Sequence, residues 1–190
     1  MPKVKTQHFR LIPHLFLLLI IFMNVSLANA QRRDNLTNEE DLIVREAQEI
    51  DLRMKVFVKI VDRRLFALND SKAATSKQAQ KVTNNDWGEL RIGTIGELFW
   101  DIQKTLDEAI GKIDDVAERD SKNPLLGRAV HILADGCKIW QPQFKSFLDK
   151  IKEEKEKGVV LTSIDNCSQI TEASTKISGD AAKEEKKKKP

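Results

Sequence analysis

Hydrophobic residues recur at intervals of three and four along the chain, with polar residues between them. The first such stretch follows the polar segment 31–41, in which Asn38 can cap a helix. Its spaced apolar residues are Ile43, Ala47, Ile50, Met54, Phe57, Val61, Leu65 and Leu68. This spacing predicts a helix from Asn38 to about Asn69. Further apolar residues at 56, 58 and 60 widen the apolar face, so we expect burial on more than one side.

The second stretch has the most regular pattern in the chain. Its apolar positions are Ile92, Ile95, Phe99, Ile102, Leu106, Ala109, Ile113 and Val116. Charged residues, beginning with Asp101, lie between them. A sustained alternation of three and four is typical of helices that pack in bundles. Gly111 weakens such a helix by about 1 kcal/mol without interrupting its apolar face.

A third helix is predicted to start at Asn123 and Pro124, because Asn caps helices and Pro fits the first helical position. Its apolar positions are Leu126, Val130, Leu133, Cys137, Trp140, Phe144, Phe147 and Ile151. Pro142 removes a backbone donor, so we expect a kink over residues 138–141. The helix should continue through the charged run 152–157 and stop at Gly158.

A fourth, weaker helix is predicted over residues 163–178. Its spaced positions are Ile164, Cys167, Thr171, Ser174 and Ile177. Residues 70–91 have the composition of a linker or crossover, and the Lys-rich residues 179–190 that of a disordered tail. No stretch shows the alternation of a strand. The predicted fold class is therefore all-α, an elongated antiparallel helical bundle of three long helices and a weaker fourth, within residues 31–178.

The first thirty residues have the order of a secretory signal peptide. Lys3, Lys5 and Arg10 precede an apolar run from Leu15 to Met23, and Ala28-Asn29-Ala30 offers a small-residue cleavage pattern. The apolar run is shorter than the roughly 20 residues of a membrane-spanning helix. We therefore expect cleavage after Ala30 and export to the periplasm or the medium, with no membrane span in the mature chain.

Charge changes the picture once the signal peptide is set aside. The 190-residue chain has 32 basic and 29 acidic residues, but the first thirty residues hold three of the basic ones and none of the acidic ones. The remainder is neutral, which removes the electrostatic case for nucleic acid binding. Within it, the basic tail 183–190 is the one segment expected to contact anionic surfaces, and only weakly in salt.

One pair of residues raises a cofactor hypothesis. His131 is the only histidine and Met54 the only methionine left after cleavage. Some exported four-helix bundles hold haem between one Met and one His, so Met54 and His131 are candidate haem ligands. Against this, Met54 fits ordinary core packing and His131 stands beside the apolar position Val130 rather than on it. We therefore predict no bound cofactor, with haem as the alternative.

Cys137 and Cys167 both lie on predicted apolar faces. They could form a disulfide or remain two buried thiols. In an oxidising compartment they could form a disulfide. If the third and fourth helices turn about Gly158, however, the two residues are offset by 12 positions, or about 18 Å along a helix. Such an offset exceeds the reach of a disulfide and favours two buried thiols. A turn near residue 152 would remove the offset.

Other chemistry is sparse. Asp107, Glu108, Asp114, Asp115 and Glu118 are expected on the outer face of the second helix, where they form a solvated surface rather than a catalytic pair. The sequence contains neither a nucleophile motif nor a phosphate-binding glycine loop. We therefore expect a non-enzymatic, exported bundle with a structural or protein-interaction role in the cell envelope. It would present charged helix faces to a partner or self-associate, and a chaperone-like role is a further alternative.

Overall fold

The computed structural model describes residues 34–69 and 87–188, with side chains as far as Ile177. The described chain is all-α, with five helices and no strand, which confirms the predicted fold class. The predicted signal peptide, residues 1–30, and most of the predicted linker, residues 70–86, lie outside the described residues. Among the helices that are described, none is long and apolar enough to cross a membrane.

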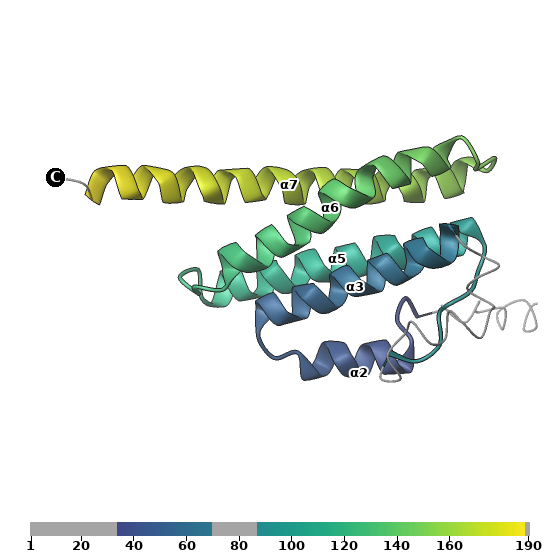
Figure 1. Ribbon diagram of the computed structural model, residues 1–190, viewed down its shortest axis with the longest axis horizontal. Coiled ribbons are helices and arrows are strands. Elements are labelled where there is room, and N and C mark those ends of the chain that lie inside the picture. Colours follow the sequence, from purple (N-terminus) through teal and green to yellow (C-terminus); the bar gives the residue numbers. More distant parts are fainter. Residues whose placement is uncertain (1–33, 70–86, 189–190) are drawn as a thin grey trace, which may run out of the picture. The chain divides into compact units, whose positions relative to one another are not determined.

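The predicted first helix is divided into two, α2 (Asn38–Glu46) and α3 (Ile50–Asn69), so the single helix was wrong. Helix α2 begins with a capping box in which Thr37, not Asn38, is the cap. The chain turns at Ala47, whose carbonyl oxygen accepts a hydrogen bond from Arg53 Nε at 2.9 Å. Helix α2 then lies against α3 (Figure 1). The apolar residues keep their spacing of three and four across this turn, so the spacing alone did not reveal the end of α2.

Helix α5 (Ile95–Arg119) begins with a second capping box, formed by Thr94 and Glu97. Ile92 precedes the helix and is 57% exposed, so its place on the predicted apolar face was wrong. The other predicted apolar residues of this helix are buried or half-buried. Helix α6 (Leu126–Leu148) follows a short turn, in which Asn123 Oδ1 accepts a hydrogen bond from the Leu125 amide at 2.9 Å. It continues as one helix through Pro142.

Helix α7 spans Glu154–Lys188. The predicted boundary between the third and fourth helices, at Gly158, was therefore wrong. The chain turns over residues 149–153, not at Gly158. Gly158 lies inside α7, where no atom would meet an added Cβ within 4 Å. The Lys and Glu residues of 152–157 are strong helix formers, and Glu154 and Glu156 favour a helix start because carboxylates complement its dipole. One Gly is too small a penalty to end the helix there.

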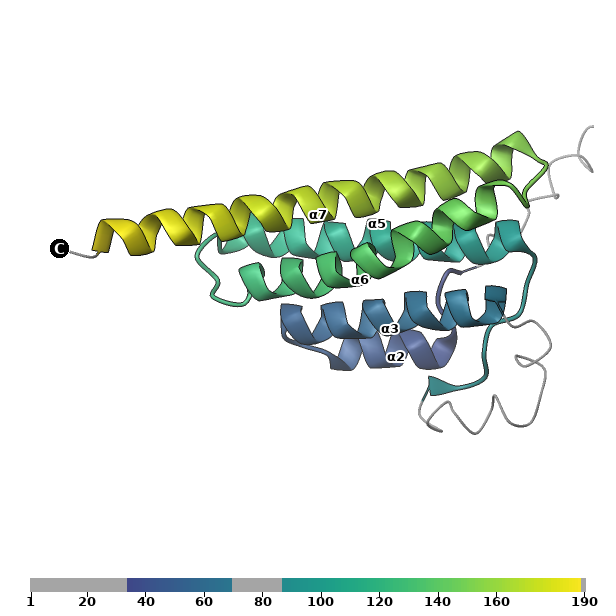
Figure 2. The same cartoon turned by 45° about the horizontal axis from the view of Figure 1, so that its top comes forward.

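The helices α3, α5, α6 and α7 form a bundle in which consecutive helices run antiparallel (Figure 2). Helix α3 packs on α5 and α6, and α7 packs on the same two helices from the other side. Two contacts fix the direction of α3 against α6: Asp51 pairs with Arg128, and Asp62 with Trp140. Because the residue numbers of α3 and α6 increase in the same direction from the first contact to the second, these two helices run parallel.

One apolar core joins the four long helices. Phe99 of α5 meets Phe144 and Phe147 of α6 edge to face, with ring centroids 5.5 and 5.4 Å apart. The fully buried Trp140 directs its Nε1 to Asp62 of α3, and the atoms are 2.7 Å apart. The predicted positions Val130, Leu133, Cys137, Trp140, Phe144, Phe147 and Ile151 of the third apolar face are all buried, as expected.

Candidate functional sites

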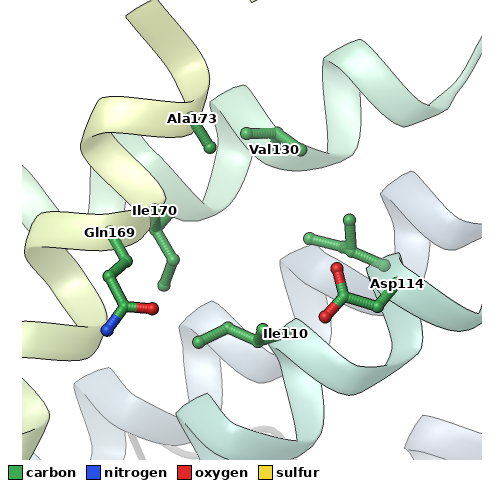
Figure 3. Close-up of a pocket in the computed structure, with 7 residues that line it drawn as sticks. Ile110, Asp114, Val130, Gln169, Ile170 and Ala173 are labelled. Carbon is green, nitrogen blue, oxygen red and sulfur yellow. The ribbon is translucent and has the colours of Figure 1, made fainter. Parts of the chain in front are cut away.

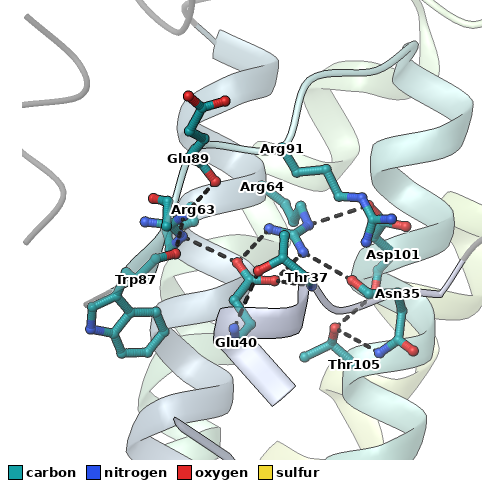
Figure 4. A network of polar contacts seen from close by, with 11 residues as sticks. Asn35, Thr37, Glu40, Arg63, Arg64, Trp87, Glu89, Arg91, Asp101 and Thr105 are labelled. Atoms are coloured by element: carbon teal, nitrogen blue, oxygen red, sulfur yellow. Dashed lines mark hydrogen bonds and ion pairs between the residues drawn. The ribbon is translucent and has the colours of Figure 1, made fainter. Parts of the chain in front are cut away.

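A buried ionic cluster joins α2, α3 and α5 (Figure 4). Glu40 is fully buried because its place in the Thr37 capping box turns its carboxylate towards α3. There Oε1 accepts hydrogen bonds from Arg64 Nη1 at 2.8 Å and from Arg63 Nε at 3.2 Å. Thr37 N also donates to the Glu40 carboxylate, at 3.0 Å. One carboxylate therefore holds the start of α2 against two adjacent arginines.

The cluster continues to α5 through Asp101, which is also fully buried. Its Oδ2 lies 3.3 Å from Arg64 Nε and 3.4 Å from Arg91 Nε. Arg63 extends the network in another direction, because its Nη2 donates to the backbone carbonyls of Trp87, Gly88 and Glu89. The cluster thus fastens the segment that leads into α5.

The electrostatics of the cluster favour its charged form. Burial by itself would raise the pKa of Glu40, but the hydrogen bond and charge of Arg64, the Thr37 amide and the charge of Arg63 together lower it below its usual value. Burial also lowers the pKa of Arg63, against the opposing effect of Glu40. A buried ion pair is costly to break, since the remaining partner is left charged without compensation. Breaking the cluster should therefore destabilise the fold.

Sequence reasoning missed this cluster. Asp101 stood among the charged residues between apolar positions, and that placement implied exposure. A signal did exist, since Arg63 and Arg64 follow the widened apolar face at Ile60 and Val61. Arginines inside such a face require a buried anionic partner. Glu40, at the third position of a capping box, could have been proposed as that partner.

A cleft of about 250 Å³ lies between α5, α6 and α7 (Figure 3). Its apolar walls are the side chains of Ile110, Ile113, Val130, Ile170 and Ala173. Asp114 of α5 and Gln169 of α7 add two exposed polar groups to its lining. For comparison, an apolar cavity of about 150 Å³ suffices to bind benzene. The cleft therefore has room for one aromatic or aliphatic group of a ligand, and Asp114 and Gln169 could accept a hydrogen bond from a donor next to that group.

The outer face of α5 next to this cleft is acidic, as the sequence predicted. Asp114, Asp115 and Glu118 are exposed, while Asp107 pairs with Lys104 at 3.1 Å and accepts a hydrogen bond from Asn166 at 2.8 Å. Residues 107–120 contain six carboxylates and two basic residues. Three of these carboxylates lie in the last turns of α5, where the helix dipole disfavours negative charge. Their placement does not stabilise the helix.

The two haem candidates lie at the same level of neighbouring helices in different environments. Met54 is three residues beyond Asp51 on α3, and His131 three residues beyond its partner Arg128 on α6. Met54 is fully buried in the apolar core, whereas His131 is half-buried. Haem ligation by this pair would require the core around Met54 to open. Among the described residues, no group of three or more His, Cys, Asp or Glu side chains is arranged to hold a metal ion.

The structure brings Cys137 and Cys167 together, contrary to the predicted offset. Both are fully buried, and each is a free thiol. The offset was wrong because it assumed a turn at Gly158, whereas the turn over residues 149–153 leaves Cys137 14 residues and Cys167 16 residues from its middle, residue 151. No protein-family model, curated protein or solved structure matches this chain, so these sites are interpreted from their own chemistry.

Proposed function

We propose that this chain is an exported, non-enzymatic helical bundle that binds a protein partner in the cell envelope. Its binding surface is the cleft between α5, α6 and α7 together with the acidic outer face of α5. The partner is a basic segment that carries one apolar side chain. The observation behind this proposal is the position of Asp114, which lines the apolar cleft and also belongs to the acidic face.

The cleft supplies the apolar part of this recognition. Its volume of about 250 Å³ accepts a single large side chain, and its aliphatic walls offer nothing that would exclude one. Binding sites commonly combine such walls with a few polar groups that fix the orientation of the ligand. Asp114 and Gln169 would take that role by accepting hydrogen bonds from the partner.

The acidic face supplies the charge complement. With six carboxylates and two basic residues, segment 107–120 carries a formal charge of −4. Exposed charges of one sign steer an oppositely charged partner and raise its association rate, and salt weakens the effect. Carboxylates at an unfavourable end of a helix are better explained by a partner than by the stability of α5.

Three alternatives from the sequence stay predictions. Haem binding by Met54 and His131 would give a Soret absorption band on addition of haem. A chaperone-like role would suppress aggregation of client proteins in proportion to concentration. Self-association would make the molar mass measured by light scattering rise with protein concentration. Of the three, self-association has some support, because Phe66 of α3 and Ile139 of α6 expose 41% and 64% of their surface.

The proposal is tested by affinity capture from the cell envelope of the source organism. The mature chain is compared with Asp114→Asn/Asp115→Asn, with Ala173→Trp, which fills the cleft, and with the exposed control Asp149→Asn. We expect a protein that the wild-type chain and the control retain and that both site variants lose, with retention weakened by salt. Identical retention by all four chains contradicts the proposal. The asparagine variant keeps the test valid if Ala173→Trp does not fold.

A further inference from the structure

The hairpin of α6 and α7 sets a register that places Cys137 opposite Cys167. Near the open end, a Cβ added to Gly127 would lie 3.4 Å from Ile177 Cγ2. Near the turn, Gln141 Nε2 donates to Ser168 Oγ at 2.9 Å and to the Ile164 carbonyl at 3.3 Å. In an antiparallel helix pair, the residue numbers of facing positions have a constant sum. Residues 127 and 177 have the same sum as residues 137 and 167, so the two cysteines face each other across the same antiparallel seam.

Facing positions in such a seam are close enough for a disulfide. Packed helices lie about 8–10 Å apart, and each Cα lies about 2.3 Å from its helix axis. Cα atoms on the line between the two axes can therefore approach to about 3–5 Å, and those beside this line lie somewhat farther apart, so the roughly 4.4–6.8 Å between the Cα atoms of a disulfide is within reach. Both side chains are fully buried in the core between the two helices.

Burial and a raised pKa of Cys137 make the folded pair a poor target for oxidation, which indicates when a disulfide would form. The hydrogen bond with Cys167, burial and the charge of a Cys167 thiolate all raise the pKa of the Cys137 thiol above its usual value. The thiolate is the form that attacks a disulfide, so the packed pair is protected from exchange. Oxidation must therefore take place during folding, when the two thiols are still accessible.

We propose that Cys137 and Cys167 form an intramolecular disulfide that links α6 to α7 as the chain folds in an oxidising compartment. The oxidant is a small-molecule or protein disulfide. One cysteine thiolate attacks it and releases one thiol, which leaves a mixed disulfide. The second cysteine thiolate then displaces the other half as a second thiol. The two cysteine sulfurs are oxidised, the donor disulfide is reduced, and both protons end on the two released thiols.

The physiological setting rests on the proposed export, but the chemistry can be tested without it. The purified chain lacking residues 1–30 is unfolded in denaturant with reductant and refolded in a mixture of reduced and oxidised glutathione. We expect a monomer that is lighter by two hydrogen atoms and has no alkylatable thiol after denaturation. Adding reductant during denaturation should restore both thiols. The supplied oxidant makes the result independent of localisation and of any partner.

A second measurement tests whether the bond fits the native fold. The oxidised chain should melt roughly 5–10 °C above the reduced chain, because the bond closes a loop of about thirty residues. A Cys137→Ala/Cys167→Ala variant should show no such difference between oxidising and reducing buffers. Two free thiols after oxidative refolding, a glutathione adduct, a disulfide-linked dimer or a lower melting temperature of the oxidised monomer would each overturn the proposal.

Discussion

The two halves of α5 place the same residue type in opposite surroundings. In the first half, Asp101 is fully buried and pairs with Arg64, and Thr105 beside it is also buried. In the second half, Asp114 and Asp115 are exposed, and no atom would meet a Cβ added to Gly111 within 4 Å. Asn35, which precedes α2, and Arg91, which precedes α5, contact the first half through Thr105 and Asp101, whereas the second half borders an open cleft.

This difference separates charges that stabilise the fold from charges that are available to a partner. A buried carboxylate next to arginines cannot be removed without leaving an uncompensated charge in the core. An exposed carboxylate in water contributes little to stability. Mutations that remove single carboxylates should therefore separate the two halves by their effect on unfolding.

The largest effect is expected from Glu40→Gln. Glutamine can still complete the capping box, but Arg63 and Arg64 lose their shared anion. We expect the free energy of unfolding to fall by about 3–5 kcal/mol. Chemical denaturation of the variant and of the wild-type chain measures this loss. The control is Glu46→Gln at an exposed position of the same helix, which should stay within about 0.5 kcal/mol of the wild type.

Acid should reproduce part of this loss. Because the folded pKa of Glu40 lies below its usual value of 4.5, its contribution to stability is fully present above that pH. It is lost as the pH falls through the lower folded value. Denaturation midpoints measured between pH 7 and pH 2 should therefore fall steeply in the acidic range. The curve for Glu40→Gln should be flatter, and parallel curves for the two chains would contradict this role of Glu40.

The most direct contrast within α5 is between Asp101→Asn and Asp114→Asn. The first leaves Arg64 and Arg91 short of a negative charge, and we expect a loss of about 2–4 kcal/mol. The second changes a solvated carboxylate and should alter stability by less than about 0.5 kcal/mol. Thermal unfolding of both variants under one set of conditions decides the point. Equal losses would show that the two halves do not differ in this way.

The smallest expected effect is a gain. Gly111→Ala adds a methyl group to an exposed helical position with no neighbour within 4 Å. Alanine lowers the backbone entropy of the unfolded chain, so stability should rise by about 0.5–1 kcal/mol. A small upward shift in the melting temperature would confirm that this part of α5 is free of packing constraints. A destabilised variant would mean that another element covers it.

The apolar faces of the helices could be predicted from sequence because they follow the period of the helix. Phe99, Leu133 and Trp140 are buried where the spacing places them. The ends of the helices were harder, since Thr37 and Asn38 are both acceptable caps and Gly158 resembles a stop. The ionic cluster depends on Glu40 meeting Arg64 across 24 residues. The arginines beside an apolar face signal a buried anion, but no local pattern fixes which carboxylate supplies it. The closeness of Cys137 and Cys167 was missed because the turn between α6 and α7 was predicted at Gly158 instead of over residues 149–153.

We propose that the cleft and the acidic half of α5 together bind a basic segment with an apolar side chain. The most direct test of this proposal is a nuclear magnetic resonance titration of the isotopically labelled chain with a short Lys-Phe-Lys peptide. We expect shifts at the amides of Ile110, Asp114, Val130 and Ala173, and we expect salt to reduce them and Ala173→Trp to abolish them. Shifts that are absent, or that spread over all exposed carboxylates and persist in Ala173→Trp, would contradict it.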